Sequence, residues 1–217
     1  MSDFARRRTM MVDNQIRPSD VTKFPIIDAM LSVPREQFVP AGRREAAYVG
    51  ENMELGGGRV ILDPRTLAKM LDAVDVQPDE LVLDVGCSYG YSTAVLARLA
   101  EAVVAVEEDE GMAREAAATL SQTEADNTAV VEGPLSEGAA KHGPYDVILV
   151  QGGVQQLPQA LLDQLAQHGR ICCLFMDGVL GVVRLGYRSE SGVSWRDLFN
   201  ASAPVLPGLA RRSAFAL

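Results

Sequence analysis

The sequence has few of the residues that build metal sites, disulfide frameworks or membrane spans. Its 217 residues include three cysteines and two histidines, and no apolar run reaches the roughly 18 residues of a transmembrane helix. Cys87, Cys172 and Cys173 are odd in number and lack CxxC spacing, so we expect reduced, buried thiols and no zinc site. Basic residues open the chain without an apolar segment after them, so no secretory signal is predicted and a cytoplasmic location is expected.

Positive charge is scarce as well, since the formal net charge is -9. Nucleic-acid-binding proteins usually carry a stripe of basic residues. The nearest candidate for such a stripe, Arg6 to Arg8, falls in a helical pattern typical of a solvated face. We therefore expect neither nucleic acid nor a membrane as a partner, while the oligomeric state stays open. The length suits one domain, residues 1–217.

From about residue 80, short apolar strand patterns alternate with helical patterns. Strands are predicted over 80–85, 102–108, 127–133, 145–151 and 169–175, and helices over 92–100, 110–120 and 157–169. Such alternation predicts a mainly parallel sheet with helices on both faces and ligands at the carboxyl ends of the strands. A hairpin turning at 189–192 and a last strand over 211–217 would make the final strands partly antiparallel.

The first 55 residues have a different pattern. Helical runs over 6–16 and 22–31, interrupted by prolines, predict a helical extension (1–55) in front of an α/β core (56–217). The core begins with LGGGRVILDP, in which three glycines indicate a mobile backbone. Asp63 and Pro64 have the residue types of a helix N-cap and first helical position.

The first predicted core strand ends in VGCSYGYS, a turn too poor in glycine to hold phosphates. Two of the three glycines of a dinucleotide turn are missing, the Gly-Lys pair of a Walker loop is absent, and no G-x-S-x-G elbow is present. A cofactor without phosphates needs only a tight turn and acidic partners. Asp84 precedes the turn, and Glu107, with Glu108 beside it, ends the next strand, where it could accept both ribose hydroxyls. This order favours S-adenosyl-L-methionine.

Several stretches resemble one family, the protein-L-isoaspartate O-methyltransferases, which use S-adenosyl-L-methionine to methylate the abnormal carboxylate of isoaspartyl residues. They are VPREQFVP (33–40), AAYVGE (46–51), VLDVGCSYGYSTAVLARLA (82–100), VVAVEED (103–109) and the segment from GPYDVILVQ to HGRI (143–171). The likeness covers about residues 8 to 175. It implies a doubly wound, mainly parallel, seven-stranded Rossmann-like methyltransferase sheet with an antiparallel C-terminal strand.

The resemblance also implies a cofactor site, with departures from the family pattern. Ser88 stands where the family has glycine in the turn, and Gly133-Pro134-Leu135 replaces a Gly-Asp-Gly whose aspartate meets adenine. Without that acceptor, adenine would be held by stacking, by backbone groups or by Glu132. The implied cofactor-binding residues are Asp84, Gly86, Cys87, Ser88, Gly90, Glu107, Glu108, Gly133 and Pro134.

The acceptor loop departs further. Where the family has G-Q-T-I-S-x-P, this chain has residues 58–64 with Val60 and Leu62 in place of two hydroxyls that orient the substrate carboxylate. Leu62, Val60 and Arg59 therefore occupy the implied catalytic positions. Arg59 or Arg65 could bind the carboxylate instead, although both are also explained as exposed arginines. Asp63 could be a base, but its N-cap position explains it without chemistry.

Three functions follow from these residues. The first is carboxyl methylation of L-isoaspartyl (D-aspartyl) residues, a protein repair reaction with damaged proteins or peptides as substrates. The second keeps S-adenosyl-L-methionine but methylates a less charged acceptor at the apolar loop. The third is a non-catalytic relative that keeps the fold as a binding module.

Overall fold

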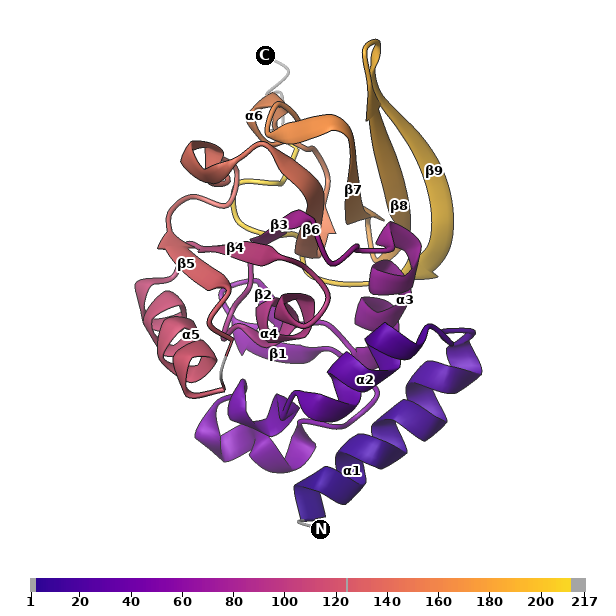
Figure 1. The fold of residues 1–217 in the computed structure, drawn as a ribbon, viewed down its shortest axis with the longest axis vertical. Coiled ribbons are helices and arrows are strands. Elements are labelled where there is room, and N and C mark those ends of the chain that lie inside the picture. Colours follow the sequence, from indigo (N-terminus) through magenta and orange to yellow (C-terminus); the bar gives the residue numbers. More distant parts are fainter. Residues whose placement is uncertain (1–2, 124, 212–217) are drawn as a thin grey trace.

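The centre of the protein is a seven-stranded sheet with the strand order β5-β4-β3-β6-β7-β8-β9 (Figure 1). It is seen in a computed structural model that describes residues 3–123 and 125–211. The strands from β3 to β7 pair in parallel, whereas β8 runs antiparallel to both of its neighbours. Their bounds are β3 Leu81–Val85, β4 Ala102–Glu107, β5 Thr128–Glu132, β6 Tyr145–Val154, β7 Leu165–Asp177, β8 Leu180–Ser189 and β9 Gly192–Ala201.

The topology confirms the mainly parallel sheet and the hairpin at residues 189–192, where Ser189 pairs with Gly192. The strand predicted over 211–217 lies, apart from Arg211, outside the described residues. Strand β3 sits between β4 and β6, so the chain reverses its direction of travel across the sheet at this point. In open parallel sheets such a switch point leaves a crevice beyond the carboxyl ends of the strands, and the turn after β3 lies there.

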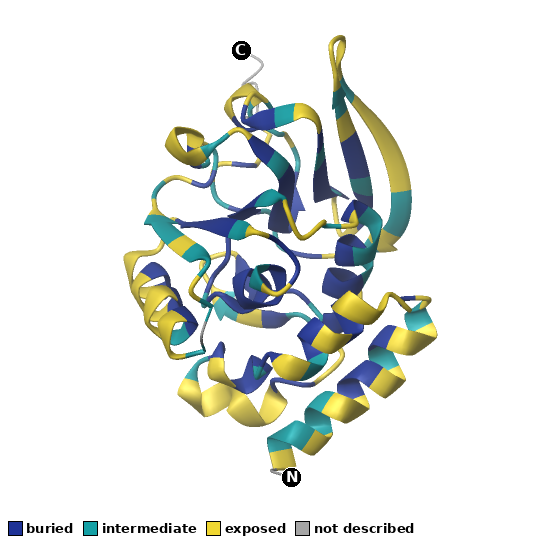
Figure 2. Ribbon diagram, in the orientation of Figure 1, coloured by how far each residue is buried: buried dark blue, intermediate teal, exposed yellow. Residues whose placement is uncertain are grey.

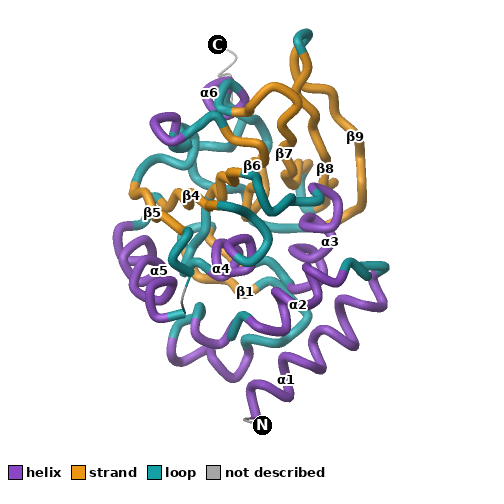
Figure 3. Tube along the Cα trace, in the orientation of Figure 1, coloured by secondary structure: helices purple, strands orange, loops and turns teal. Residues whose placement is uncertain are grey.

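Successive side chains of the central strands point to opposite faces of the sheet and so belong to two separate cores. Val82 and Val147 belong to the first core, and Leu83 and Ile148 to the second. The first face is covered by helices, and Figure 3 shows most of the long helices gathered on one side of the strands. These are α2 (Phe24–Ser32), α3 (Pro64–Val74) and α4 (Tyr91–Ala97), with α5 (Glu110–Gln122) beside β4 and β5.

The second face has a thinner cover, and here the predicted helix over 157–169 is wrong in extent. Helix α6 spans only Gln159–Leu162, and β7 already begins at Leu165. Leu165 pairs with Tyr145, and the backbone N–H of Tyr145 donates to the carbonyl of Gln164 at 2.8 Å. His168 has φ +67°, which no right-handed helix allows. Pairing with β6 therefore overrides the helical periodicity of this segment.

The N-terminal extension is helical, as predicted, and packs against the first core (Figure 2). Helix α1 (Asp3–Met11) runs through one π turn (Val12–Ile16) and a 3-10 turn (Arg17–Ser19) toward α2, and further 3-10 turns span Arg35–Gln37 and Ala41–Ala46. Arg6 is exposed, but Arg8 is not on a solvated face. Its guanidinium donates to the carbonyls of Leu31 and Ser32 and to the hydroxyl of Tyr48, so it joins both ends of the extension.

Between the extension and the sheet lies a small hairpin of β1 (Met53–Gly56) and β2 (Arg59–Ile61). The turn that joins them, Gly56 to Gly58, has φ of +89°, +58° and +75°, which explains three consecutive glycines. This hairpin was not predicted from the sequence. Asp63 then caps α3 as predicted, because its carboxylate accepts from the N–H of Thr66 at 2.9 Å. Within the described residues, no helix has the length and apolarity to cross a membrane.

Candidate functional site

The turn after β3 packs tightly against the neighbouring strand. The N–H of Gly86 donates to the carbonyl of Val106 at 2.8 Å, and the N–H of Gly90 closes the turn onto the carbonyl of Cys87 at 2.9 Å. Gly86 and Gly90 have φ of +80° and +90°. Ser88 has φ +54°, so this serine adopts the left-handed conformation that glycine adopts without strain.

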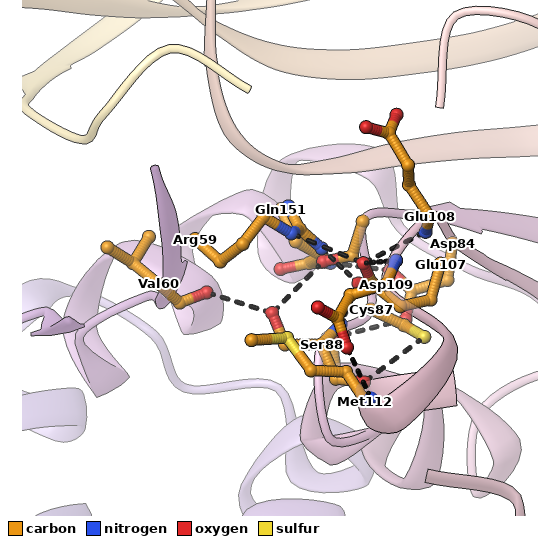
Figure 4. Close-up of polar contacts among 12 residues, drawn as sticks. Arg59, Val60, Asp84, Cys87, Ser88, Glu107, Glu108, Asp109, Met112 and Gln151 are labelled. Atoms are coloured by element: carbon orange, nitrogen blue, oxygen red, sulfur yellow. Dashed lines mark hydrogen bonds and ion pairs between the residues drawn. The ribbon is translucent and has the colours of Figure 1, made fainter. Parts of the chain in front are cut away.

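Glu107 lies beside this turn with its carboxylate fully buried. Three backbone N–H groups donate to it, those of Ser88 at 2.8 Å, Glu108 at 2.9 Å and Asp109 at 3.1 Å. The guanidinium of Arg59 completes the shell through Nη2 and, at 3.3 Å, through Nε (Figure 4). Both members of this ion pair are buried, with side-chain exposures of 4% and 0%.

Asp84 lies beneath the turn rather than in an open site. Its Oδ2 accepts from the hydroxyls of Ser92 and Thr93, both at 2.7 Å, and its Oδ1 accepts from the Gln151 amide at 2.7 Å. Burial raises the pKa of this carboxyl above its ordinary value, and the three hydrogen bonds oppose that effect. Asp84 thus fastens the start of α4 and the end of β6 to β3, with both oxygens occupied.

The surroundings of Cys87 and Gly90 indicate that both residues have structural roles. Burial raises the pKa of the Cys87 thiol well above its ordinary value, and the nearby Asp84 and Glu107 raise it further, so this cysteine is no thiolate nucleophile. A Cβ placed on Gly90 would lie 3.3 Å from the Cβ of Ala116, which shows how closely the turn approaches α5. In the part of the chain that the structure describes, no cluster of three or more histidine, cysteine or acidic side chains could hold a metal.

A cavity of about 410 Å³ opens beside Glu107, within the size range of ligand sites. Glu108 is exposed at its rim, and Figure 4 shows its side chain pointing away from the buried cluster. Gly133 lies next to the same strand end, where its N–H donates to the carbonyl of Glu107 at 3.0 Å, and Pro134 is exposed. The cavity is lined by Leu55, Gly56, Gly57, Arg59, Glu107, Glu108, Asp109, Met112 and Pro207.

Strand β2 and the residues that lead from it into α3 turn their apolar side chains inward. Val60 and Leu62 are only 1% and 2% exposed. Their carbonyls are engaged as well, since Ser88 Oγ donates to Val60 at 3.3 Å and Arg35 Nη2 donates to Leu62 at 2.8 Å. Arg65, by contrast, is exposed on the first turn of α3.

Most of the chain matches one family of known proteins. Residues 6–176 match the family model described as protein-L-isoaspartate(D-aspartate) O-methyltransferase (PCMT). The chain belongs to this family. A protein-L-isoaspartate O-methyltransferase 2 of Pelobacter propionicus is 35% identical over 192 residues, 85% of each chain, and a protein-L-isoaspartate O-methyltransferase 1 of Rhodopseudomonas palustris is 38% identical over 170 residues, 78% of this chain and 69% of that one.

Solved structures of the family share the fold. A protein-L-isoaspartate O-methyltransferase superposes with a TM-score of 0.81 at 22% identity, over 94% of this chain and 67% of its own. A beta-aspartate methyltransferase (PCMT) from Plasmodium falciparum, in complex with S-adenosyl-L-homocysteine, superposes with a TM-score of 0.78 at 18% identity, over 95% and 99% of the two chains. The Rossmann-like methyltransferase sheet inferred from the sequence is thereby confirmed.

The family's cofactor fits one part of this site and conflicts with another. The tight turn, the acid at the end of β4 and the adjoining cavity suit an adenosine without phosphates. The carboxylate that would accept the ribose hydroxyls, however, is already held by Arg59, which was predicted as an acceptor-loop residue or an exposed arginine. Neither position describes it, because its side chain is buried on Glu107.

Sequence reasoning missed several residues that shape the site. Ser92, Thr93 and Gln151 hold Asp84, and their hydroxyl and amide groups near the carboxyl ends of two strands were the available signal. Arg35 lies within the stretch that carried the family resemblance, and its contact with Leu62 gives that stretch a physical role. Leu206, which follows β9 in the chain, contacts the turn, and no pattern in the sequence predicted this contact.

Proposed function

We propose that this protein is an S-adenosyl-L-methionine-dependent carboxyl O-methyltransferase that acts on L-isoaspartyl (D-aspartyl) residues of damaged proteins. The observation that carries the proposal is the pairing of the 86–90 turn with the buried acid Glu107 at adjacent carboxyl ends of β3 and β4, in a chain of the isoaspartyl methyltransferase family. Methylation would activate the abnormal carboxylate as an ester, which can cyclise to a succinimide and reopen to normal aspartate.

The cofactor would be held by few side chains. We assign the binding of the ribose hydroxyls to Glu107. The backbone of Gly86 to Ser88 would contact the cofactor where it lies beside the turn. The segment Gly133-Pro134 would border the adenine with backbone groups and the proline ring, since no aspartate is present there. The loss of one net hydrogen bond to adenine would weaken cofactor binding by about 1 to 2 kcal/mol.

The chemistry makes small demands on the protein's own side chains. When bound, the cofactor supplies a methyl group on a sulfonium, which is a strong leaving group. A carboxylate acceptor has a pKa near about 4 and is ionised at neutral pH, so no general base is needed. The protein's tasks are to exclude water and to hold the carboxylate oxygen in line with the methyl group. Asp63 fits this view, because its carboxylate caps α3.

Alignment of the acceptor is where this chain departs from its family. Val60 and Leu62 are buried in the core and have no hydroxyl to offer. Absence of one donor to a charged group corresponds to about 1.5 to 3 kcal/mol, or roughly a tenfold to hundredfold lower rate. Because the two side chains face inward, they present no apolar surface to a less charged acceptor, and this disfavours the second function considered above.

A non-catalytic relative is the second candidate, and one observation favours it. In the structure, Arg59 occupies the carboxylate that a cofactor would need. A protein that had given up the reaction could keep such an ion pair to stabilise its fold.

Methyl transfer from labelled S-adenosyl-L-methionine tests both candidates. An isoaspartyl peptide should gain base-labile label, released as methanol, while the same peptide with normal aspartate should gain none. A Glu107→Ala variant, checked for folding, is the matched negative control. Equal labelling of the two peptides would refute isoaspartyl selectivity, and no labelling by a protein that binds S-adenosyl-L-homocysteine would favour a non-catalytic role.

We further propose a cytoplasmic location and a protein or peptide partner rather than nucleic acid. The negative net charge and the three free cysteines support this proposal, because basic stripes accompany nucleic-acid binding and paired cysteines accompany secretion. Fractionation of cells that express the chain at native level, probed by antibody, would test the location.

A further inference from the structure

Among the residues that the structure describes, donors occupy every acceptor position of Glu107. A carboxylate offers about four lone-pair sites, and five donors from within the chain already point at this one. They are the N–H groups of Ser88, Glu108 and Asp109, together with Nε and Nη2 of Arg59. The three backbone donors come with the fold of the turn and the start of α5. Only the guanidinium can leave without unfolding its surroundings.

The same guanidinium covers the turn itself. A Cβ placed on Gly86 would lie 3.1 Å from Arg59 Nη1 and 3.2 Å from Leu206 Cδ1. Leu206 also closes over the end of β6, where a Cβ on Gly152 would lie 2.7 Å from it. The space directly above the glycine of the turn is therefore filled by one arginine and one leucine of this chain.

Arg59 is incompletely satisfied in this position. Its side chain is 4% exposed, and Nη1 is buried without a hydrogen-bond partner among residues 3–123 and 125–211. A buried, unpaired donor carries a desolvation cost. This cost destabilises the arrangement in which Arg59 lies on Glu107 relative to one in which Nη1 is hydrated.

Release of Glu107 requires movement of the Arg59 side chain alone, because Val60 and Ile61, which follow it in β2, are buried in the first core. Strand β2 pairs with β1 in a separate two-stranded sheet, not with the central sheet. It follows the turn Gly56 to Gly58, and no atom in the described part of the chain lies within 4 Å of a Cβ placed on Gly56 or Gly57. Gly56, Gly57 and Arg59 line the cavity of about 410 Å³ beside Glu107, so there is space for the side chain to swing into.

We propose that Arg59 is an internal competitor for the cofactor's ribose site, a latch that must release Glu107 before the cofactor can bind. The inference rests on the proposed cofactor site and adds a resident occupant to it. In the closed state Nε and Nη2 take the positions on Glu107 that the two ribose hydroxyls would take. Apparent affinity for the cofactor is then the intrinsic affinity multiplied by the fraction of molecules in the open state.

Removal of the latch should strengthen cofactor binding, the reverse of what the loss of a ligand-contacting arginine would do. The probe is S-adenosyl-L-homocysteine, titrated by calorimetry into wild type, Arg59→Gln and Arg65→Gln. Gln is the residue of the family pattern at position 59, and Arg65, exposed six positions further on, controls for loss of one positive charge. If the open state is 10% populated or less, Arg59→Gln should bind at least about tenfold tighter than wild type, with Arg65→Gln unchanged.

Binding kinetics give a second readout that a merely structural role would not alter. In wild type the observed rate should level off at high ligand concentration, because opening limits it, whereas in Arg59→Gln it should keep rising. If Arg59→Gln does not fold, Arg59→Lys serves instead, since a single ammonium cannot replace the planar fork and the latch should be weakened.

The outcomes separate this inference from the proposed function. Arg59→Gln that binds as wild type does, or more weakly, would refute the latch while leaving the cofactor site intact. If wild type, Arg65→Gln and the Arg59 variant that folds all fail to bind the probe, the proposed function itself fails, and the Arg59–Glu107 pair is a permanent structural ion pair.

Discussion

The buried pair of Arg59 and Glu107 predicts an asymmetric loss of stability when either partner is removed. Glu107→Ala would leave three buried backbone N–H groups without an acceptor and the guanidinium of Arg59 without its counter-ion. Breaking a buried pair in this way costs about 3 to 5 kcal/mol. Arg59→Ala leaves the carboxylate with its three backbone donors, so the cost should be smaller, about 1.5 to 3 kcal/mol for the charged hydrogen bonds lost.

These energies correspond to large changes in melting temperature. For a domain of this size, 1 kcal/mol moves the melting temperature by roughly 2 to 4 °C. Glu107→Ala should therefore melt about 6 to 20 °C below wild type and Arg59→Ala about 3 to 12 °C below it. The double variant should be more stable than Glu107→Ala alone, because no charge is then left buried without a partner.

Thermal unfolding of the four proteins without ligand, followed by circular dichroism and repeated by urea titration, completes the double-mutant cycle. Arg65→Ala, which removes an exposed arginine, should stay within about 0.5 kcal/mol of wild type. Two findings would refute the reasoning: equal losses for the two single variants, or a double variant whose loss is the sum of both.

Three further predictions concern the turn, the base of the sheet and the thiols. Because Ser88 has φ +54°, Ser88→Gly should be about 1 kcal/mol more stable than Ser88→Ala in urea titrations, and the opposite order would mean that the turn relaxes around the side chain. Burial acts to raise the pKa of Glu80, but the hydrogen bonds from Arg170 and from the N–H of Gln77, together with the charge of Arg170, outweigh it and lower that pKa. The stability that Glu80 contributes is thus present above its ordinary pKa of about 4.3 and lost as pH falls through the lower pKa of the folded protein. Wild type should therefore melt above Glu80→Gln at neutral pH, by a difference worth about 1 kcal/mol or less after solvent screening. This difference in melting temperature should vanish toward pH 3, and a constant difference would contradict the argument. Since all three cysteines are free and buried, a thiol reagent should label none of them in the native protein within minutes and all of them in denaturant, and one fast native thiol would show that a cysteine is accessible.

Much of the geometry around the turn after β3 could be predicted because its signals are local. The strand before the turn, the tight turn itself and the acid at the end of the next strand follow from residue type and short spacing. Asp84 was placed correctly in the fold, but its interpretation as a ligand group did not anticipate that Ser92, Thr93 and Gln151 would occupy both of its oxygens. Side-chain partners from other elements are not encoded in the neighbourhood of a residue.

The sequence by itself determined the alternation of strands and helices, the helix start at Asp63 and the order of turn and acid. These depend on backbone preferences and periodicity within a few residues. The resemblance to the family rests on longer matching stretches. Only the tertiary structure decided that Arg59 lies on Glu107, 48 residues away, and that Leu206 closes the same turn. It also decided that residues 165–169 join β7, because pairing with β6 outweighs a weak local preference for helix. An ion pair or a strand register brings together groups that are distant in the chain, so its energy exists only once the whole fold has placed them in contact.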